Sequence, residues 1–296
     1  MTRFALTGLA GYIAPRHLKA IKEVGGVLVA SLDPATNVGL VDSFFPEAEF
    51  FTEPEAFEAY LEDLRDRGEG VDYLSIASPN HLHYPQIRMA LRLGANALSE
   101  KPLVLWPEEI ARLKELEART GRRVYTVLQL RVHPSLLALK ERLGQEKGAK
   151  DVVLTYVTGR GKWYGKSWKV DEAKSGGLAT NIGIHFFDLL AWLFGRALHV
   201  EVHARTPTVN AGYLELEGAR VRWFLSIDPS RSIAVDGEEV EFSEGFTDLH
   251  TEVYRKTLAG EGFGLDEAAE AIRVAALLRT LPLSQPSPEN RHPFLG

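Results

Sequence analysis

Short apolar segments alternate with amphipathic helical segments over the first 128 residues, and this alternation limits the fold more than any other feature of the chain. Strands are predicted at residues 4–7, 27–32, 71–77, 95–98 and 124–128, with helices at 15–24, 54–67, 84–93 and 107–120. Short apolar strands separated by helices are typical of a parallel sheet that is covered on both faces. With right-handed crossovers, we expect an α/β, Rossmann-type doubly wound domain whose ligand lies at the carboxyl ends of the strands.

The pattern changes after about residue 129. Strands without intervening helices are predicted at 152–158, 200–204, 211–217, 221–227 and 234–242, and helices at 247–258 and 266–280. Turn residues link these strands as in antiparallel meanders. We therefore predict a dinucleotide-binding domain over residues 1–128 and a second, α+β domain over 129–296, built on an open, mostly antiparallel sheet that serves substrate binding and oligomerisation.

Composition excludes several classes of protein. The net charge of −6 argues against a general nucleic-acid binder, and no apolar run approaches the ~18 residues that a membrane span needs. The chain has no cysteine, which removes disulfides, thiolate catalysis and cysteine-bound zinc. The N-terminus passes directly into a predicted strand, so we expect no cleavable signal and a cytoplasmic location.

A glycine-containing turn follows the first predicted strand. Gly8 and Gly11 lie where a backbone can approach a pyrophosphate, and Tyr12 and Ile13 lead into the helix, whose N-terminus favours an anion. The spacing departs from G-x-G-x-x-G, as if one residue were inserted. The alternative is a tight strand-to-helix turn that binds no ligand.

Asp33 ends the second predicted strand. A carboxylate there would accept hydrogen bonds from the adenosine ribose and would repel a 2′-phosphate, so NAD is preferred to NADP. The alternative is a turn residue before Pro34.

Two polar loops follow later strands of the same sheet. Ser78, Pro79 and Asn80 would form the wall near the nicotinamide, with Asn80 as the N-cap of the next helix. His81 and His83 lack accompanying ligands, so we expect no metal site. The cofactor-binding residues are then predicted to be Gly8, Gly11, Tyr12, Ile13, Asp33, Ser78, Pro79, Asn80, His83, Glu100, Lys101 and Gln129.

Lys101 follows the next strand in the run Glu100-Lys101-Pro102. A lysine at this edge can bind a substrate hydroxyl and stabilise its oxygen as hydride leaves. The alternative is a solvated lysine in a surface turn.

His185 lies in a stretch of helical appearance, four residues after Asn181 and three before Asp188, so all three are predicted to share one helix face. A histidine is the usual side chain for taking a hydroxyl proton at neutral pH. The alternative is a buried structural histidine bonded to Asp188.

Cationic and aromatic side chains gather in residues 160–174, here called the 160–174 segment. This pattern suits an anionic substrate, and the alternatives are a solvated loop or a short nucleic-acid contact. The substrate-binding residues are predicted to be Lys101, Arg131, His133, Arg160, Lys162, Trp163, Tyr164, Ser167, Trp168, Lys174, Asn181 and His185.

Together these motifs resemble the Gfo/Idh/MocA oxidoreductases over nearly the whole chain. The resemblance rests on the turn at 8–14 with His17, on Ser78-Pro79-Asn80, on Glu100-Lys101-Pro102, and on Gly176-Gly177 followed by His185 and Asp188. Residues 11–17, 129–134 and 174–185 are similar, more narrowly, to WlbA/WbpB-type dehydrogenases, which oxidise the 3-hydroxyl of UDP-N-acetylglucosaminuronic acid for surface polysaccharide (O-antigen) synthesis. The resemblance implies NAD as cofactor, a UDP-hexuronic acid as substrate and a homotetramer, and in some members 2-oxoglutarate as the acceptor that regenerates NAD.

Asn181 departs from the family pattern, since many members carry aspartate there. Asparagine can orient a hydroxyl but cannot take its proton, which favours His185 as the base and Lys101 as the residue that holds the oxygen; reversed roles stay open. Two other functions also stay open: a dehydrogenase of a free sugar or inositol, and a non-catalytic NAD-binding regulator.

Overall fold

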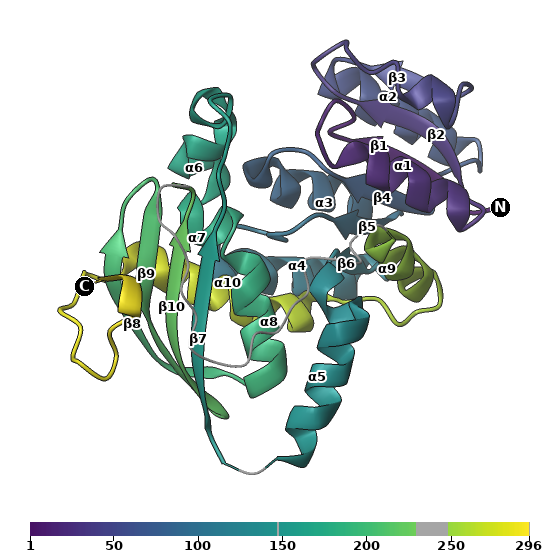
Figure 1. Cartoon of the computed structure of the whole chain (residues 1–296). Helices are drawn as coiled ribbons and strands as arrows, with labels where there is room; N and C mark the ends of the chain where they lie inside the picture. Colours follow the sequence, from purple (N-terminus) through teal and green to yellow (C-terminus); the bar gives the residue numbers. More distant parts are fainter. Residues whose placement is uncertain (147, 229–247, 296) are drawn as a thin grey trace. The chain divides into compact units, whose positions relative to one another are not determined.

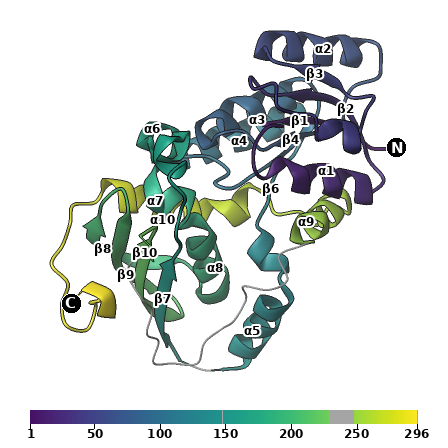
Figure 2. The ribbon, with the colours of Figure 1, turned by 45° about the horizontal axis from the view of Figure 1, so that its top comes forward.

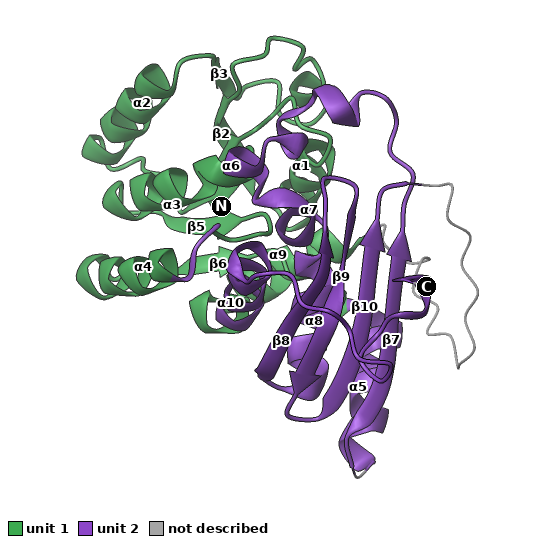
Figure 3. Cartoon of the chain, turned by 90° about the vertical axis from the view of Figure 1, so that its left-hand side faces the viewer, with its two compact units in different colours: residues 1–104, 108–132, 245–268 green, residues 105–107, 133–244, 269–296 purple. Residues whose placement is uncertain are grey.

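The computed structural model describes residues 1–146, 148–228 and 248–295 (Figure 1). The chain forms two compact units, shown in Figure 3. Unit 1 comprises residues 1–104, 108–132 and 245–268, and unit 2 comprises 105–107, 133–244 and 269–296. The strand predicted at 234–242 lies outside the described residues.

Unit 1 is built on a six-stranded parallel sheet in the order β3-β2-β1-β4-β5-β6. The strands are β1 (Arg3–Thr7), β2 (Val27–Leu32), β3 (Glu49–Phe51), β4 (Tyr73–Ile76), β5 (Asn96–Ser99) and β6 (Val124–Thr126). Strand order reverses between β1 and β4, which is where doubly wound folds bind their ligands. The prediction of a Rossmann-type sheet is confirmed, and only β3 had no predicted counterpart.

Helices cover both faces of this sheet (Figure 1). They are α1 (Ala14–Glu23), α2 (Pro54–Asp66), α3 (His83–Arg92), α4 (Pro107–Thr120) and α9 (Leu249–Leu258), with short 3-10 turns η1 (Val41–Ser43), η2 (Asn80–Leu82) and η3 (Gln129–Val132). Helices α2 and α3 contact β2 to β5, whereas α1 and α9 lie side by side (Figure 2).

Helix α9 belongs to unit 1, although the division of the sequence at residue 128 assigned it to the second domain. Its buried Val253 and Tyr254 share one hydrophobic cluster with Phe4 of β1 and with Leu18 and Ile21 of α1. The apolar face of α9 therefore completes the core of unit 1. Chain order alone misassigned it, because the chain returns to unit 1 after building the second sheet.

Unit 2 is built on a four-stranded sheet in the order β7-β10-β9-β8. The strands are β7 (Lys150–Val157), β8 (Ala197–Arg205), β9 (Val209–Leu216) and β10 (Ala219–Ser226). Strand β10 pairs with β7 in parallel, and the other two pairs are antiparallel. The predicted open, mostly antiparallel sheet is confirmed as a mixed sheet.

The remaining helices are α5 (Pro134–Gln145), α6 (Glu172–Ser175), α7 (Gly177–Asn181), α8 (Ile184–Phe194) and α10 (Leu265–Thr280), with η4 (Tyr164–Lys166), η5 (Trp168–Val170) and η6 (Pro293–Leu295). Successive residues of β10 face opposite sides of the sheet. Trp223 packs edge-on against Phe187 of α8, with ring centroids 5.3 Å apart. On the other side, Phe224 packs against His292 and Phe294 near the C-terminus.

None of the described helices is by itself long and apolar enough to cross a membrane. Two consecutive segments, 172–181 and 184–194, meet that test of length and composition only when taken together, and they are bent by 46°.

Candidate active site

The turn after β1 requires a glycine at its first position. Gly8 has φ +82°, and a Cβ there would lie 2.4 Å from the backbone of Ala77. The close approach of the turn to β4 therefore leaves no room for a side chain. Helix α1 begins at Ala14 with Ile13 at its N-cap and no side-chain cap. The N-terminus of this helix is thus available to an anionic group such as a pyrophosphate.

Asp33 is tied to this turn by one carboxylate oxygen and to its own following loop by the other. Oδ2 accepts a hydrogen bond from the N–H of Ala10 at 2.9 Å, and Oδ1 accepts one from the N–H of Ala35 at 2.9 Å. Each carboxylate oxygen has a second lone pair, so ribose hydroxyls can still donate to Asp33. Gly8, the uncapped helix and Asp33 together fit a dinucleotide.

The loop after β4 is fastened from two sides. Ser78 and Thr7 both donate hydrogen bonds to Oε1 of Gln86 at 2.7 Å. The fully buried His83 has Nε2 2.8 Å from the carbonyl oxygen of Ser78 and Nδ1 2.7 Å from that of Pro102. Burial lowers the pKa of His83 more than these two carbonyl oxygens raise it. His83 therefore connects the loop after β4 to the loop after β5.

The expectation that Asn80 caps the next helix is wrong. Asn80 opens the turn η2, with Pro79 in the capping position. Helix α3 begins at His83 and has Leu82 at its N-cap, without a side-chain cap. The 3-10 turn moves the start of the helix past Asn80, which is itself buried.

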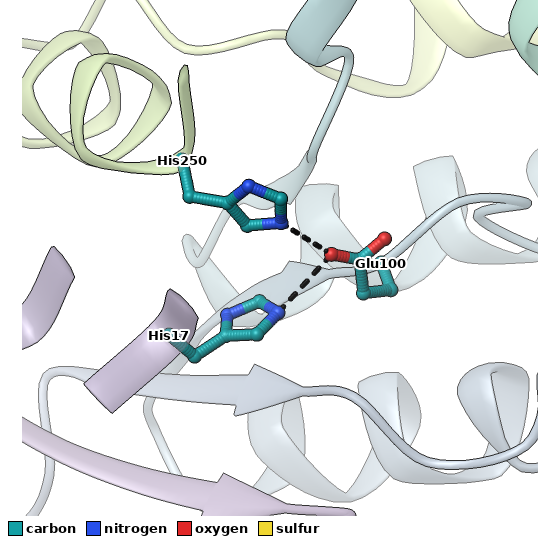
Figure 4. Close-up of side chains that lie close together, drawn as sticks. All are labelled: His17, Glu100 and His250. Carbon is teal, nitrogen blue, oxygen red and sulfur yellow. Dashed lines mark hydrogen bonds and ion pairs between the residues drawn. The ribbon is translucent and has the colours of Figure 1, made fainter. Parts of the chain in front are cut away.

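Glu100 is buried, and three N–H groups converge on its carboxylate, two of them from the histidines drawn in Figure 4. Oε1 lies 3.2 Å from Nε2 of His17 and 2.8 Å from Nε2 of His250. Oε2 accepts a hydrogen bond from the backbone N–H of Lys101 at 3.2 Å. Burial works to raise the pKa of Glu100, but the bonds from the two histidines outweigh it and hold this pKa well below its usual range.

The hydrogen bonds continue from His17 into the core of unit 1. Nδ1 of His17 lies 2.7 Å from Oη of Tyr254, which lies 2.7 Å from Oγ of Ser75. Sequence reasoning used His17 only as part of a motif and missed His250 and Tyr254 as site residues. Their spacing of four residues on α9 puts both on one helix face, but no local pattern in the sequence relates that face to Glu100.

Two of the predicted site residues, Gln129 and Arg131, lie in η3 at the end of the 108–132 segment of unit 1, and a third, His133, follows in unit 2. The side-chain oxygen of Gln129 is buried and has no partner among the described residues. Arg131 donates a hydrogen bond to the carbonyl oxygen of Glu267 at 2.9 Å and lies over the ring of Phe263. His133, buried at the N-cap of α5, begins the second segment of unit 2.

In unit 2, Asn181 and His185 lie on two different helices, which corrects the expectation that they share one helix face. Helix α7 ends at Asn181 and α8 begins at Ile184. Gly183 lies at the break, where a Cβ would be 2.4 Å from the carbonyl oxygen of Ala179. The spacing of four residues therefore does not relate Asn181 to His185, whereas His185 and Asp188 share α8.

The structure brings the 160–174 segment together with Asn181. Nδ2 of Asn181 donates to Oη of Tyr164 at 3.2 Å, and Tyr164 is buried. Burial raises the pKa of Tyr164, partly offset by the bond from Asn181 and the charge of Arg160. Ser167 donates to the carbonyl oxygen of Tyr164 at 2.8 Å and so holds the segment in its turn.

The other members of this segment are more exposed. The side chain of Trp163 is 56% exposed, and Lys162 is also exposed. Lys169 lies 4.5 Å from the ring centroid of Trp168, and Lys174 forms an ion pair of 3.7 Å with Asp171. Cations and aromatic surfaces are thus accessible together, as an anionic ligand with a planar ring would need.

Comparison with protein families identifies both halves of the chain. Residues 2–128 match the oxidoreductase family model for an NAD-binding Rossmann fold, and residues 150–239 match the model for the C-terminal alpha/beta domain of the same family. The chain belongs to the Gfo/Idh/MocA oxidoreductase family. The first unit of this oxidoreductase is accordingly an NAD-binding domain, as its turn and Asp33 indicated.

Solved structures include two similar to the whole of this oxidoreductase. Both are of the WlbA (WbpB) dehydrogenase from Thermus thermophilus. The complex with NAD and alpha-ketoglutarate is 94% identical, with a TM-score of 0.97, and covers 99% of this chain and 100% of its own. The complex with NAD and UDP-GlcNAcA is 95% identical, with the same coverages and a TM-score of 0.96.

Curated relatives are more distant. An uncharacterized oxidoreductase from Synechocystis is 32% identical over 46% of this chain, and the match spans only 38% of that relative. Inositol 2-dehydrogenase from Corynebacterium glutamicum is 25% identical over 86% of this chain and 72% of its own length.

Proposed function

We propose that this oxidoreductase catalyses the NAD-dependent oxidation of the 3-hydroxyl of UDP-N-acetylglucosaminuronic acid to a 3-keto sugar. The observation that carries the proposal is identity of 94–95%, over 99% of the chain, with a dehydrogenase solved with NAD and with UDP-GlcNAcA. The positions of Lys101, in the loop after β5, and of His185, on α8, support it.

NAD would bind to unit 1 and, when bound, supplies the hydride acceptor. Gly8, Gly11, Tyr12 and Ile13 would hold its pyrophosphate at the start of α1, and Asp33 would accept the ribose hydroxyls. Ser78, Pro79, Asn80, Lys101 and Gln129 would line the nicotinamide side. His83 and Glu100 would hold these loops in place, because their polar atoms bond to backbone groups of the loops.

Lys101, His185 and Asn181 would act on the sugar. Lys101 holds and polarises the oxygen at C3, and His185 takes the hydroxyl proton. Asn181 orients a sugar hydroxyl, a role that suits an amide anchored by Tyr164. Because an amide cannot accept the proton, the transfer is assigned to His185.

The anionic groups of the substrate give the 160–174 segment its role. Arg160, Lys162 and Lys174 supply positive charge for the diphosphate and the carboxylate, and Trp163 and Trp168 offer surfaces for stacking. Tyr164 and Ser167 maintain the conformation of the segment. Arg131 and His133, which follow β6, would add to the binding of these anionic groups.

The proposal includes 2-oxoglutarate, which would accept the hydride from NADH and be reduced to 2-hydroxyglutarate, so that NAD is regenerated. The structure of the Thermus thermophilus relative with alpha-ketoglutarate supports this step. We further propose that the protein is a cytoplasmic homotetramer that acts in surface polysaccharide synthesis, with no membrane or nucleic-acid partner.

Product analysis tests the proposal. Purified protein would be incubated with NAD, 2-oxoglutarate and UDP-N-acetylglucosaminuronic acid, and the mixture analysed by mass spectrometry. The expected result is loss of two hydrogens from the sugar, matched by 2-hydroxyglutarate. An unchanged UDP-sugar and no binding of UDP would instead favour a dehydrogenase of inositol or a free sugar. The similarity to inositol 2-dehydrogenase from Corynebacterium glutamicum makes this the second candidate.

A further inference from the structure

Three buried side chains from distant parts of the sequence meet at the carboxylate of Glu100. His17 comes from α1, His250 from the first turn of α9, and Glu100 directly follows β5. Figure 4 shows both rings directed at the same oxygen, Oε1. All three belong to unit 1.

The hydrogen positions in this cluster follow from its donors and acceptors. An ionised carboxylate only accepts, so each ring carries hydrogen on Nε2. Nδ1 of His17 is then an acceptor for the hydroxyl of Tyr254, whose oxygen accepts from Ser75. Burial lowers the pKa of His17 and raises that of Tyr254, which keeps the imidazole neutral and the phenol a donor. Along the path from Ser75 through Tyr254 and His17 to Glu100, every hydrogen-bond donor therefore has an acceptor.

The same three side chains resemble a metal site in composition, because one oxygen and two ring nitrogens lie within 4.8 Å of one another. However, a metal would need both Nε2 atoms without hydrogen. Separations of 2.8 and 3.2 Å from a shared oxygen are those of N–H donors to a carboxylate. The hydrogen-bond network accounts for each of these atoms without an ion.

We propose that His17 and His250 are positioning residues for Lys101 and act through Glu100. The two histidines fix one carboxylate oxygen, and the other oxygen accepts the backbone N–H of Lys101. The bond fixes the backbone position of Lys101, from which the lysine side chain reaches the substrate oxygen. A displacement of about 1 Å at a reacting group costs on the order of 10²-fold in rate. The inference rests on the proposed function, because it takes Lys101 to hold the substrate hydroxyl.

His250 offers the cleaner variants, because its Nδ1 has no partner among the described residues. In His250→Gln the amide N–H can occupy the place of Nε2–H, whereas His250→Leu removes the donor and keeps the volume. We expect His250→Leu to lower kcat by roughly 10- to 100-fold and leave both KM values within about 2-fold. His250→Gln should regain most of the lost kcat.

His203 provides a matched control in unit 2. Its ring is also buried, and its Nε2 lies 2.8 Å from Oε2 of Glu201. His203→Leu therefore removes a similar bond from a similarly buried ring. It should leave kcat unchanged if the effect at His250 depends on the path to Lys101.

A double-mutant cycle with Lys101→Ala separates positioning from general damage. If His250 acts through Lys101, His250→Leu should change kcat by less than about 2-fold in the Lys101→Ala background, because interacting sites are not additive. Equal losses in both backgrounds would overturn the inference. So would stoichiometric zinc in the purified protein that is removed by a chelator together with activity.

Exchange of the Lys101 amide tests the network independently of activity. In full-length protein, this amide should be protected in wild type and in His250→Gln and exchange faster in His250→Leu. Unaltered protection in His250→Leu would overturn the inference even if the UDP-sugar were not a substrate. A wild-type protein that leaves the UDP-sugar unchanged but shows this exchange pattern would contradict the proposed function only.

Discussion

Glu100 and Glu201 each accept hydrogen bonds from two histidines, yet the two clusters are built in different ways. At Glu201, His199 and His203 come from the same strand, β8, and bond to separate oxygens at 3.0 and 2.8 Å. At Glu100, the histidines come from two helices far apart in the sequence and share one oxygen. The side chain of His199 is 56% exposed, whereas that of His17 is fully buried.

This difference decides what each cluster can do. Water can replace the bond from His199, and Asn290 also donates to Oε1 of Glu201 at 3.1 Å, so the loss of His199 there costs little stability, although His203 is buried. In the interior of unit 1, a lost partner leaves a buried donor or charge without compensation, at about 1–3 kcal/mol or more. A buried network therefore holds a loop in one geometry, which suits the Glu100 cluster to positioning Lys101.

The largest effect is expected at the end of the Glu100 network. Lys101→Ala should lower turnover by roughly 10²–10⁴-fold, because it removes the cation that polarises the oxygen from which His185 takes the proton. NAD affinity, measured by calorimetry, should stay close to that of wild type, because the pyrophosphate turn and Asp33 are intact. Full activity of this variant would remove Lys101 from the mechanism.

Matched substitutions of the two carboxylates compare the clusters directly. Glu100→Gln puts an amide donor against N–H groups and leaves a buried donor without an acceptor, so it should lower the free energy of unfolding by about 1–3 kcal/mol. Glu201→Gln should lower it by about 0–1 kcal/mol. Urea titrations at pH 7 measure both, and equal losses would contradict the distinction between the clusters.

Acid should destabilise the protein through the Glu100 cluster. The lowered pKa of His17 means that the unfolded chain binds a proton below about pH 6.5 while the folded chain resists it. The lowered pKa of Glu100 contributes stability that is present above pH 4.5 and is lost as the pH falls through the folded pKa. Stability should therefore fall with pH below about 6.5, by up to about 1.4 kcal/mol per pH unit for each proton taken up.

This pH dependence also separates the clusters. Glu100→Gln should flatten the fall in urea midpoint at the acid end, because the ionisable carboxyl has gone. In Glu201→Gln most of the fall should be retained, although the bonds from His203 and His199, opposed by burial, lower the pKa of Glu201 as well. A steep fall that persists unchanged in Glu100→Gln would contradict the assignment.

The smallest effect is expected at the exposed histidine. His199→Ala removes one bond to Glu201 and should change the free energy of unfolding by less than about 0.5 kcal/mol. Thermal unfolding at pH 7 would measure this, with His17→Ala as the buried counterpart. A loss at His199 as large as that at His17 would show that exposure does not separate the clusters.

The sequence predicted those features that depend on local pattern. Short apolar strands and their helices gave the parallel sheet, and the alternation His199, Glu201, His203 on a strand would have been sufficient to find that cluster. Strand β3 was missed because three residues carry almost no periodicity. The helix break at Gly183 was missed because apolar spacing does not show the close approach to Ala179, where a Cβ would lie 2.4 Å from the carbonyl oxygen.

The Glu100 cluster could not be predicted in the same way. Glu100 and Lys101 were recognised from their motif, but His250 is 150 residues away along the chain, on a helix that chain order assigned to the other domain. The packing of Tyr254 and Val253 against α1 brings that helix back to unit 1. Long-range packing of this kind leaves no spacing for a single sequence to reveal.

Isotope transfer tests the central claim most directly. UDP-N-acetylglucosaminuronic acid carrying deuterium at C3 would be incubated with wild-type protein, NAD and unlabelled 2-oxoglutarate, and the products analysed by mass spectrometry. The account predicts deuterium at C2 of 2-hydroxyglutarate and a 3-keto sugar, with both strongly reduced in Lys101→Ala. Recovery of the UDP-sugar with its deuterium intact, from protein that binds NAD, would contradict it.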